Sequence, residues 1–289
     1  MAGNTDVQPA GGHQGESTLG KLLSDTGKIS EADVQRILQY ARTKGVRFGE
    51  AAVRLRLVKR TDVDRALATQ FDYSYISEDS SNLSREVIAA YNPFTPKVEA
   101  LRSLRVQLML GSFASTANAL AVVSPSSGDG RSFIAANLAV VFSQLGERTL
   151  LVDAHLQKSR LHELFGVPNT DGLSAALVGR TSGVLKTINV PQFKNLSLVP
   201  GGAHPPNADE LLARDTFAKV CSLLTKEYDV VIFDTPPGNT STGVDWIADR
   251  CGKALMVVRQ NRTPYAETKA FVNRIRSRAD VVGSVLNRY

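Results

Sequence analysis

The feature that most constrains the fold is a glycine-rich turn between an apolar strand and an apolar helix. The predicted strand is Ala119–Ser124, and the turn SPSSGDGRSF covers Ser124–Phe133, called the glycine loop below. Apolar residues then recur at helical spacing up to Gly146, and a second apolar strand follows at Thr149–Ala154. Strand, loop, helix and strand in this order predict a right-handed crossover between parallel strands. The chain therefore requires an α/β fold, with a mostly parallel sheet and helices on both faces.

The glycine loop has the chemistry of a phosphate cradle. A loop that leads from a strand into a helix presents free N–H groups and the positive end of the helix dipole to one point. Gly128 and Gly130 allow the backbone to approach a ligand closely. Ser132 is placed to bind Mg²⁺, while Arg131 stands where such loops normally carry lysine and keeps the positive charge as a planar fork. The residues expected to bind nucleotide here are Ser127, Gly128, Asp129, Gly130, Arg131, Ser132 and Phe133.

Two predicted strands end in an acidic residue. Asp153 lies near the end of the second strand, and Asp234 ends YDVVIFD before Thr-Pro-Pro. Each acid alone is equally well read as a helix cap or a turn residue, but open α/β sheets bind ligands at the carboxyl ends of their strands. We therefore expect Ser132, Asp153 and Asp234 to hold Mg²⁺, and Arg131, Asp153 and Asp234 to be the catalytic residues of a phosphoryl transfer from ATP. Strands are also expected at Lys253–Arg259 and Val281–Asn287.

The first part of the chain contains a repeat. Thr18–Leu38 aligns with Arg47–Leu67, so that Gly20 matches Gly49 and Val34 matches Val63. Each copy predicts a short helix, a turn, an N-cap (Ser30 or Thr61) and a second helix. One copy could not bury its apolar face alone, but two packed together could. We expect a small, mainly helical domain at residues 17–76, after a disordered tail at 1–16.

This repeat resembles the N-terminal domain of type II secretion ATPases, which also precedes some polysaccharide tyrosine kinases. The resemblance implies either cyclic di-GMP binding through Arg47 and Gln70 or docking on another protein. Residues 77–96 are rich in Ser, Asn and Pro and predict a linker. The nucleotide-binding domain is then expected at 97–289.

The composition limits the cellular compartment and the binding partners that we expect. No apolar run approaches the roughly 20 residues that a membrane helix needs, and the first residues have no signal-peptide pattern. The two cysteines, Cys221 and Cys251, predict buried thiols in a reducing cytoplasm. Seven basic residues against two acidic ones lie in Val257–Tyr289. They predict a solvated helix face or a surface for anionic lipid or an acidic partner, and the lack of interleaved aromatics argues against nucleic acid.

The glycine loop, TLLVDAHLQKSRLH, HPPNADELL and YDVVIFDTPP in this order resemble the bacterial tyrosine kinases of capsule and exopolysaccharide synthesis, in particular the chain-length determinant kinases of the EpsG type. The resemblance implies a P-loop, MinD-like fold, ATP with Mg²⁺, and an (auto)kinase that works with a separate inner-membrane polysaccharide co-polymerase. The chain would then lie in the cytoplasm, peripheral to the inner membrane through that partner. It implies subunit contacts in a homo-oligomer through Glu99, Arg102 and Arg105 of VEALRSLR. By weaker analogy, Asn287 would contact adenine.

The sequence departs from that family after Asp153, where Gln157 and Ser159 also replace the usual Arg and Pro, and at its C-terminal end. His155 stands where the family usually has a second Asp, and Tyr289 is the only tyrosine at the C-terminal end. If autophosphorylation occurs, it would use Tyr289 or a loop tyrosine such as Tyr265. Two alternatives stay open: a nucleotide-switched regulatory ATPase of polysaccharide export with little kinase activity, and a MinD/ParA-like positioning ATPase. The second is opposed by Ser126, where that group carries a lysine.

Overall fold

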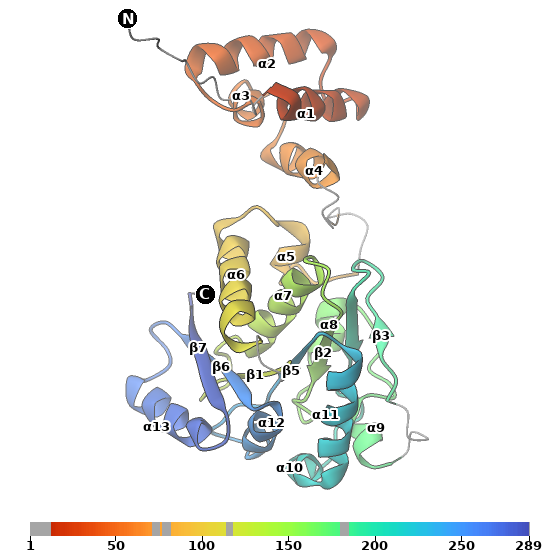
Figure 1. The fold of residues 1–289 in the computed structure, drawn as a ribbon, viewed down its shortest axis with the longest axis vertical. Helices are drawn as coiled ribbons and strands as arrows, with labels where there is room; N and C mark the ends of the chain where they lie inside the picture. The colour runs from red at the N-terminus through yellow and green to blue at the C-terminus, as the bar shows by residue number, and fades with distance from the viewer. Residues whose placement is uncertain (1–12, 71–75, 77–81, 114–117, 180–184, 289) are drawn as a thin grey trace, which may run out of the picture. The chain divides into compact units, whose positions relative to one another are not determined.

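The structure is a computed structural model that describes residues 13–70, 76, 82–113, 118–179 and 185–288. The chain divides into two compact units, the first ending at residue 75 and the second beginning at Ile76 (Figure 1). Each unit has its own hydrophobic core. They are treated separately below.

The first unit consists of helices α1 (His13–Asp25), α2 (Glu31–Lys44), α3 (Phe48–Arg54) and α4 (Arg60–Gln70). Helix α1 begins at His13, so the tail predicted at 1–16 is helical over its last residues, and residues 1–12 lie outside the described part. The predicted N-cap at Ser30 is confirmed, because its hydroxyl accepts from the backbone N–H of Asp33 in a capping box. The predicted cap at Thr61 is wrong, because α4 begins at Arg60 and Thr61 therefore lies inside the helix. The Asp62 carboxylate accepts from the N–H of Lys59, just before the helix, at 3.0 Å.

The matched glycines of the repeat make matching contacts. A Cβ atom added to Gly20 would lie 3.4 Å from Val34 Cγ1, and one added to Gly49 would lie 2.7 Å from Val63 Cγ1. Each glycine thus lies close to a valine in the second helix of its own copy, and Gly20 is closer still to Phe48 of the other copy, at 3.2 Å.

The linker predicted at 77–96 is wrong over much of its described part. Residues 88–91 form helix α5 (Ile88–Tyr91), and Val87, Ala89 and Ala90 are fully buried in the core of the second unit. The buried side chain of Asn137 holds this segment, accepting from the N–H of Ala89 at 2.9 Å and donating to the carbonyl of Glu86 at 2.9 Å. The Ser, Asn and Pro content predicts a linker, but the apolar residues among them pack into the core of the second unit.

The second unit is built on a seven-stranded sheet with the order β3-β4-β2-β5-β1-β6-β7. The strands are β1 (Ala119–Val123), β2 (Thr149–Asp153), β3 (Ile188–Asn189), β4 (Leu196–Val199), β5 (Val230–Asp234), β6 (Lys253–Arg259) and β7 (Asp280–Asn287). All neighbours are parallel except β3 and β4. The five predicted strands, which are β1, β2, β5, β6 and β7, and the mostly parallel sheet are therefore confirmed.

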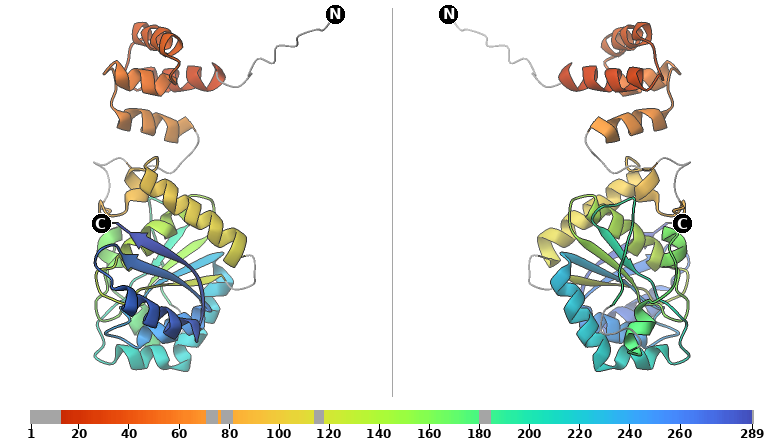
Figure 2. Two further views of the ribbon diagram at one scale, coloured as in Figure 1. Left: turned by 90° about the vertical axis from the view of Figure 1, so that its left-hand side faces the viewer. Right: turned by 90° about the vertical axis from the view of Figure 1, so that its right-hand side faces the viewer.

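Alternate residues of the strands enter two separate cores. Leu120 and Val122 of β1 pack under α5, α6 (Pro96–Gln107), α7 (Arg131–Ser143) and α8 (Leu161–Phe165), whereas Ala121 and Val123 face the other side. That side is covered by α9 (Leu173–Leu177), α10 (Ala208–Ala213), α11 (Asp215–Glu227), α12 (Gly243–Cys251) and α13 (Tyr265–Arg276). A π-helical turn, η1 (Leu108–Ser112), extends α6. Figure 2 shows these helix layers around the sheet. Both faces are covered, which explains why the strands read as apolar runs.

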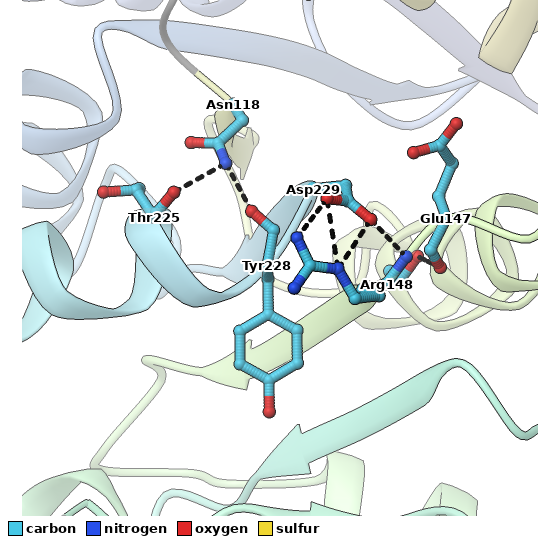
Figure 3. A network of polar contacts seen from close by, with 7 residues as sticks. Asn118, Glu147, Arg148, Thr225, Tyr228 and Asp229 are labelled. Atoms are coloured by element: carbon cyan, nitrogen blue, oxygen red, sulfur yellow. Dashed lines mark hydrogen bonds and ion pairs between the residues drawn. The ribbon is translucent and has the colours of Figure 1, made fainter.

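The amino ends of the central strands are fastened by a polar network (Figure 3). Arg148, just before β2, forms an ion pair with Asp229, just before β5, with 2.6 Å between its terminal nitrogen and the carboxylate. Asn118, before β1, donates to the carbonyl oxygens of Thr225 and Tyr228. This network fixes the strands at the end opposite to the glycine loop.

Candidate functional site

The glycine loop connects β1 to α7 and adopts a conformation that requires glycine at two positions. Gly128 and Gly130 have φ angles of 82° and 104°, in the left-handed region. A Cβ atom on Gly130 would lie 2.2 Å from the side-chain nitrogen of Asn287. That nitrogen donates to the carbonyl of Asp129 at 3.0 Å. Asn287, at the end of β7, therefore packs directly on the loop.

Asp129 holds the loop together from inside. Its side chain is fully buried, accepting from the N–H of Ser126 at 3.0 Å and from the hydroxyl of Thr263 at 2.8 Å. Since both carboxylate oxygens have protein partners, only the backbone of Asp129 is left for the expected nucleotide contact. The carboxylate ties the loop to the segment between β6 and α13.

Arg131 is buried beneath the loop and bonded on several sides. Its Nε donates to the carbonyl of Thr235 at 2.9 Å, and one terminal nitrogen donates to the carbonyl of Ser126 at 2.8 Å and to the Ser124 hydroxyl. Burial lowers the pKa of the guanidinium, while the charges of Asp234 and Asp129 raise it. The cation predicted for the phosphates thus also joins the ends of β1 and β5.

Asp234 and Asp153 stand side by side, because they are register partners at the carboxyl ends of β5 and β2. The hydroxyl of Ser132 donates to one oxygen of Asp234 at 2.5 Å. The other oxygen, Oδ1, is buried and has no hydrogen-bond partner within the described residues. Burial, followed by the charge of Asp153, raises the pKa of Asp234 to about 7. The three predicted metal ligands are therefore brought together, with a carboxylate oxygen that still needs a partner.

The Asp153 carboxylate organises the turn after β2. Its Oδ2 accepts from the Ser159 hydroxyl and from the N–H groups of Arg160 and Leu161, each at 2.9 Å, and its Oδ1 accepts from the N–H of His155 at 3.3 Å. Burial raises the pKa of this carboxyl, and these bonds oppose the shift. Asp153 therefore caps the turn after β2, as its reading as a cap residue predicts, and that turn forms one wall of the cavity; its role as a site residue stays a prediction.

A cavity of about 480 Å³ lies beside the glycine loop and the turn after β2, and the buried carboxylates of Asp153 and Asp234 are not among the residues that line it. Ser127, Gly128, Gly130, Arg131, Ser132, Phe133 and Asn287 line it, as expected for nucleotide-binding residues. His155 also lines it, and burial, aided by the charges of Arg131 and Lys158, lowers its pKa to about 4, so the imidazole is neutral at pH 7. The lining residues that the sequence analysis missed are Glu86, Lys158, Ser159, Arg160, Glu163 and Arg259. The lining residues between 158 and 163 could have been predicted, because they follow a strand that ends in an acidic residue. No sequence pattern around Glu86 indicates that it lines the cavity.

None of the other predicted site residues that the structure describes lines this cavity. Glu99 and Arg102 pair on α6, and Arg105 donates to the carbonyl of Val141 at 2.5 Å, so Arg105 is partly used within its own subunit. Arg47 is exposed at the start of α3 and Gln70 ends α4, both in the first unit. Tyr289 lies outside the described residues. In the part of the chain that the structure describes, no helix is both long and apolar enough to cross a membrane.

This arrangement defines a class of protein by its fold: a P-loop α/β domain with a MinD-like, mostly parallel sheet. MinD from Pyrococcus horikoshii, solved with Mg-ADP, shares this fold at a TM-score of 0.50 and 23% identity, over 60% of this chain and 70% of that one. A family model of the cellulose biosynthesis protein BcsQ matches residues 118–270.

Relatives give a narrower assignment. The chain is 35% identical over 204 residues to the tyrosine-protein kinase wzc of Salmonella typhi, covering 70% of this chain and 28% of that protein. It is 30% identical over 193 residues to the putative tyrosine-protein kinase CapB of Staphylococcus aureus, covering 66% of this chain and 83% of CapB. The crystal structure of the chimerical protein CapA2B2 matches at a TM-score of 0.67 and 30% identity, over 78% of this chain and 98% of that one. The kinase domain of Escherichia coli tyrosine kinase ETK matches at a TM-score of 0.66 and 28% identity, over 70% and 79%. The chain belongs to the bacterial tyrosine-protein kinase family.

Proposed function

We propose that this chain binds ATP with Mg²⁺ and transfers the terminal phosphoryl group to tyrosine, as an (auto)kinase that regulates exopolysaccharide chain length and export. The observation that carries the proposal is the Ser132–Asp234 pair at the glycine loop, in which Asp234 Oδ1 has no hydrogen-bond partner among the described residues. Membership of the tyrosine-protein kinase family supports the choice of acceptor.

The residues present fit Mg²⁺. This ion takes oxygen ligands and usually keeps several of its waters. The Ser132 hydroxyl, which lines the cavity, would bind the ion directly, and the buried Asp234 would hold it through water. Bound Mg²⁺ neutralises charge on the phosphates.

The remaining roles follow from where each group lies. The N–H groups of residues 128–132 hold the phosphates at the start of α7, and Arg131 supplies positive charge from beneath. In the transfer, a bond forms between the tyrosine oxygen and the γ-phosphorus, and the bond from that phosphorus to ADP breaks. The tyrosine proton passes to Asp153 through Ser159, which lines the cavity and already donates to that carboxylate. The raised pKa of Asp153 favours its acceptance of the proton.

The direct test is the intact mass of the purified chain after incubation with ATP and Mg²⁺. We expect a gain of one or more phosphates that is absent when the metal is chelated, together with phosphotyrosine in the product. Tyr265 is 80% exposed at the start of α13, so Tyr265→Phe and Tyr289→Phe are tested singly and together. A chain that binds ATP but gains no phosphate would contradict the kinase assignment.

His155 favours a second candidate, the regulatory ATPase with little kinase activity. The neutral imidazole supplies no second carboxylate beside the metal position. We expect His155→Asp to raise the autophosphorylation rate by about 10-fold or more, since a positioned acid or base contributes about that much or more. His155→Gln, which keeps a neutral side chain, should match the parent. Equal rates for the aspartate and glutamine variants, measured by phosphotyrosine formation, would contradict a role for charge at this position.

The proposed assembly follows from the family resemblance. The kinase would act beside a separate inner-membrane polysaccharide co-polymerase, peripheral to the membrane, with oligomer contacts at Glu99, Arg102 and Arg105. Among these, Glu99 is well suited to an intersubunit contact because its side chain is 59% exposed. The first unit would bind cyclic di-GMP through Arg47 and Gln70 or dock on another protein; the exposure of Arg47 fits either use.

A further inference from the structure

Arg160 has its backbone fixed beside the buried carboxylates. Its N–H donates to Asp153 Oδ2 at 2.9 Å, and its carbonyl accepts from the N–H of Glu163 at 3.0 Å as α8 begins. The base of the side chain is therefore held next to Asp153, the register partner of Asp234. The backbone of Arg160 is therefore fixed, while its guanidinium can change its hydrogen-bond partner.

The guanidinium of Arg160 pairs with Glu86 across the wall of the cavity. The distance from its terminal nitrogen to Glu86 Oε1 is 2.5 Å, and both residues line the cavity. The backbone of Glu86 is also fixed, because its carbonyl accepts from the buried Asn137 and its N–H donates to Ser84. The ion pair thus joins two anchored segments that are 74 residues apart in the sequence.

This ion pair is easily exchanged. The side chains of Arg160 and Glu86 are 45% and 33% exposed, and ion pairs so open to water contribute little to stability. A guanidinium binds a phosphate with two parallel hydrogen bonds, which makes phosphate a strong competitor for Arg160. A polyphosphate in the cavity would also be repelled by Glu86, because both are negatively charged.

Arg131, the cation of the glycine loop, already bonds to protein groups, so another cation could bind the terminal phosphate. Arg131 is committed to Ser124, Ser126 and Thr235 and lies beneath the loop. Lys158 also lines the cavity, but its side chain is a flexible point charge, without the planar fork of Arg160. Arg259 lines the cavity as well, and its guanidinium donates to the Gly128 carbonyl of the loop at 3.2 Å. Arg160 is a lining guanidinium whose partner is a partly exposed carboxylate, Glu86, at the cavity wall.

We propose that Arg160 leaves Glu86 for the terminal phosphate of a bound nucleoside triphosphate, so that the Glu86–Arg160 pair sets the preference for triphosphate over diphosphate. This inference rests on the proposed function, namely nucleotide binding at the glycine loop. Glu86 is then a competitor that lowers triphosphate affinity, and Arg160 is the residue that reads the γ-phosphate.

Calorimetric titration of the full chain with Mg-ADP and with Mg-AMP-PNP tests the inference. We expect Arg160→Gln to weaken AMP-PNP binding by about 10-fold, the size of a charge-assisted contact, and to leave ADP binding within about twofold. Arg160→Lys should recover part of the loss. Glu86→Gln should tighten AMP-PNP binding selectively, and the double variant should behave as Arg160→Gln. Arg148→Gln, which breaks an exposed arginine–carboxylate pair at the far end of the sheet, is the matched control and should change neither affinity.

The outcomes separate the two proposals. Wild-type chain that binds neither nucleotide contradicts the proposed function and the inference with it. Wild-type chain that binds both, with an unchanged ratio of affinities in Arg160→Gln, contradicts the inference alone. A selective loss of the same size in Lys158→Ala would also overturn it, because the effect would then come from general positive charge. Melting curves of each variant confirm that the fold is intact.

Discussion

Replacing Asp234 with alanine is expected to lower the affinity for Mg-ATP by about 10- to 100-fold, the usual cost of losing a group that supports a metal. The carboxylate is buried at the end of β5, holds the Ser132 hydroxyl, and has an oxygen without a hydrogen-bond partner among the described residues. Without it, Ser132 loses its acceptor and the water that would bind the ion loses its anchor. Calorimetry at fixed Mg²⁺ concentration measures the effect.

The same strand provides the control. Asp229 lies just before β5, at its opposite end, and pairs with Arg148 far from the glycine loop. Asp229→Ala should therefore leave nucleotide affinity unchanged. If both aspartate variants bind Mg-ATP as the parent does, Asp234 has been assigned the wrong role.

The raised pKa of Asp234 gives this prediction a pH dependence. The folded-state pKa is about 7, against 3.8 for an ordinary aspartate, so the carboxyl is mostly protonated below pH 7. Since the metal needs the ionised form, Mg-ATP affinity should rise up to about tenfold per pH unit below 7 and level off above it. The stability of the ligand-free protein should change in the opposite sense: the folded state keeps a proton that the unfolded state loses above about pH 4, so Asp234 makes the fold less stable as pH rises toward 7. Asp234→Asn should remove both trends.

The parts of the fold that follow from short-range pattern were predictable. Apolar runs bounded by turn residues predicted β1, β2 and β5, and because these strands are parallel, the acidic ends of β2 and β5 had to lie at the same edge as the glycine loop after β1. That Asp153 and Asp234 lie at the same edge of the sheet therefore followed from the sequence, whereas their side-by-side placement comes from the pairing of β2 with β5, which the sequence analysis did not predict. The N-cap at Ser30 did too, since its partner is only three residues away.

What depends on contacts between distant segments was not predictable. Nothing near Glu86 in the sequence indicates that it pairs with Arg160, and the segment around it has the composition of a linker. The partners of Arg131 are likewise set by tertiary packing, because Thr235 is 104 residues away. A motif indicates which residue types surround a phosphate, but not what else those side chains hold.

Arg131 therefore leads to a prediction that separates folding from binding. Arg131→Ala removes a buried cation that bonds to three residues and leaves Asp234 without its compensating charge. We expect the free energy of unfolding to fall by about 3 kcal/mol, the usual cost of breaking a buried charged pair. Nucleotide binding should be lost as well. A variant as stable as the parent in urea denaturation would contradict the joining role of this side chain.

Arg131→Lys is expected to be less stable than the parent but to bind Mg-ATP as well or better. A lysine cannot bridge Ser124, Ser126 and Thr235 as a fork does, so about 1–2 kcal/mol of stability should be lost with those hydrogen bonds. The freed ammonium, on a flexible stem, can instead reach the β- and γ-phosphates, as the lysine of such loops does. Denaturation and calorimetry on the same sample measure the two effects. A lysine variant that loses affinity in proportion to its loss of stability would contradict this prediction. Arg131 would then affect nucleotide binding only through the shape of the loop, and its positive charge would not contribute to phosphate binding.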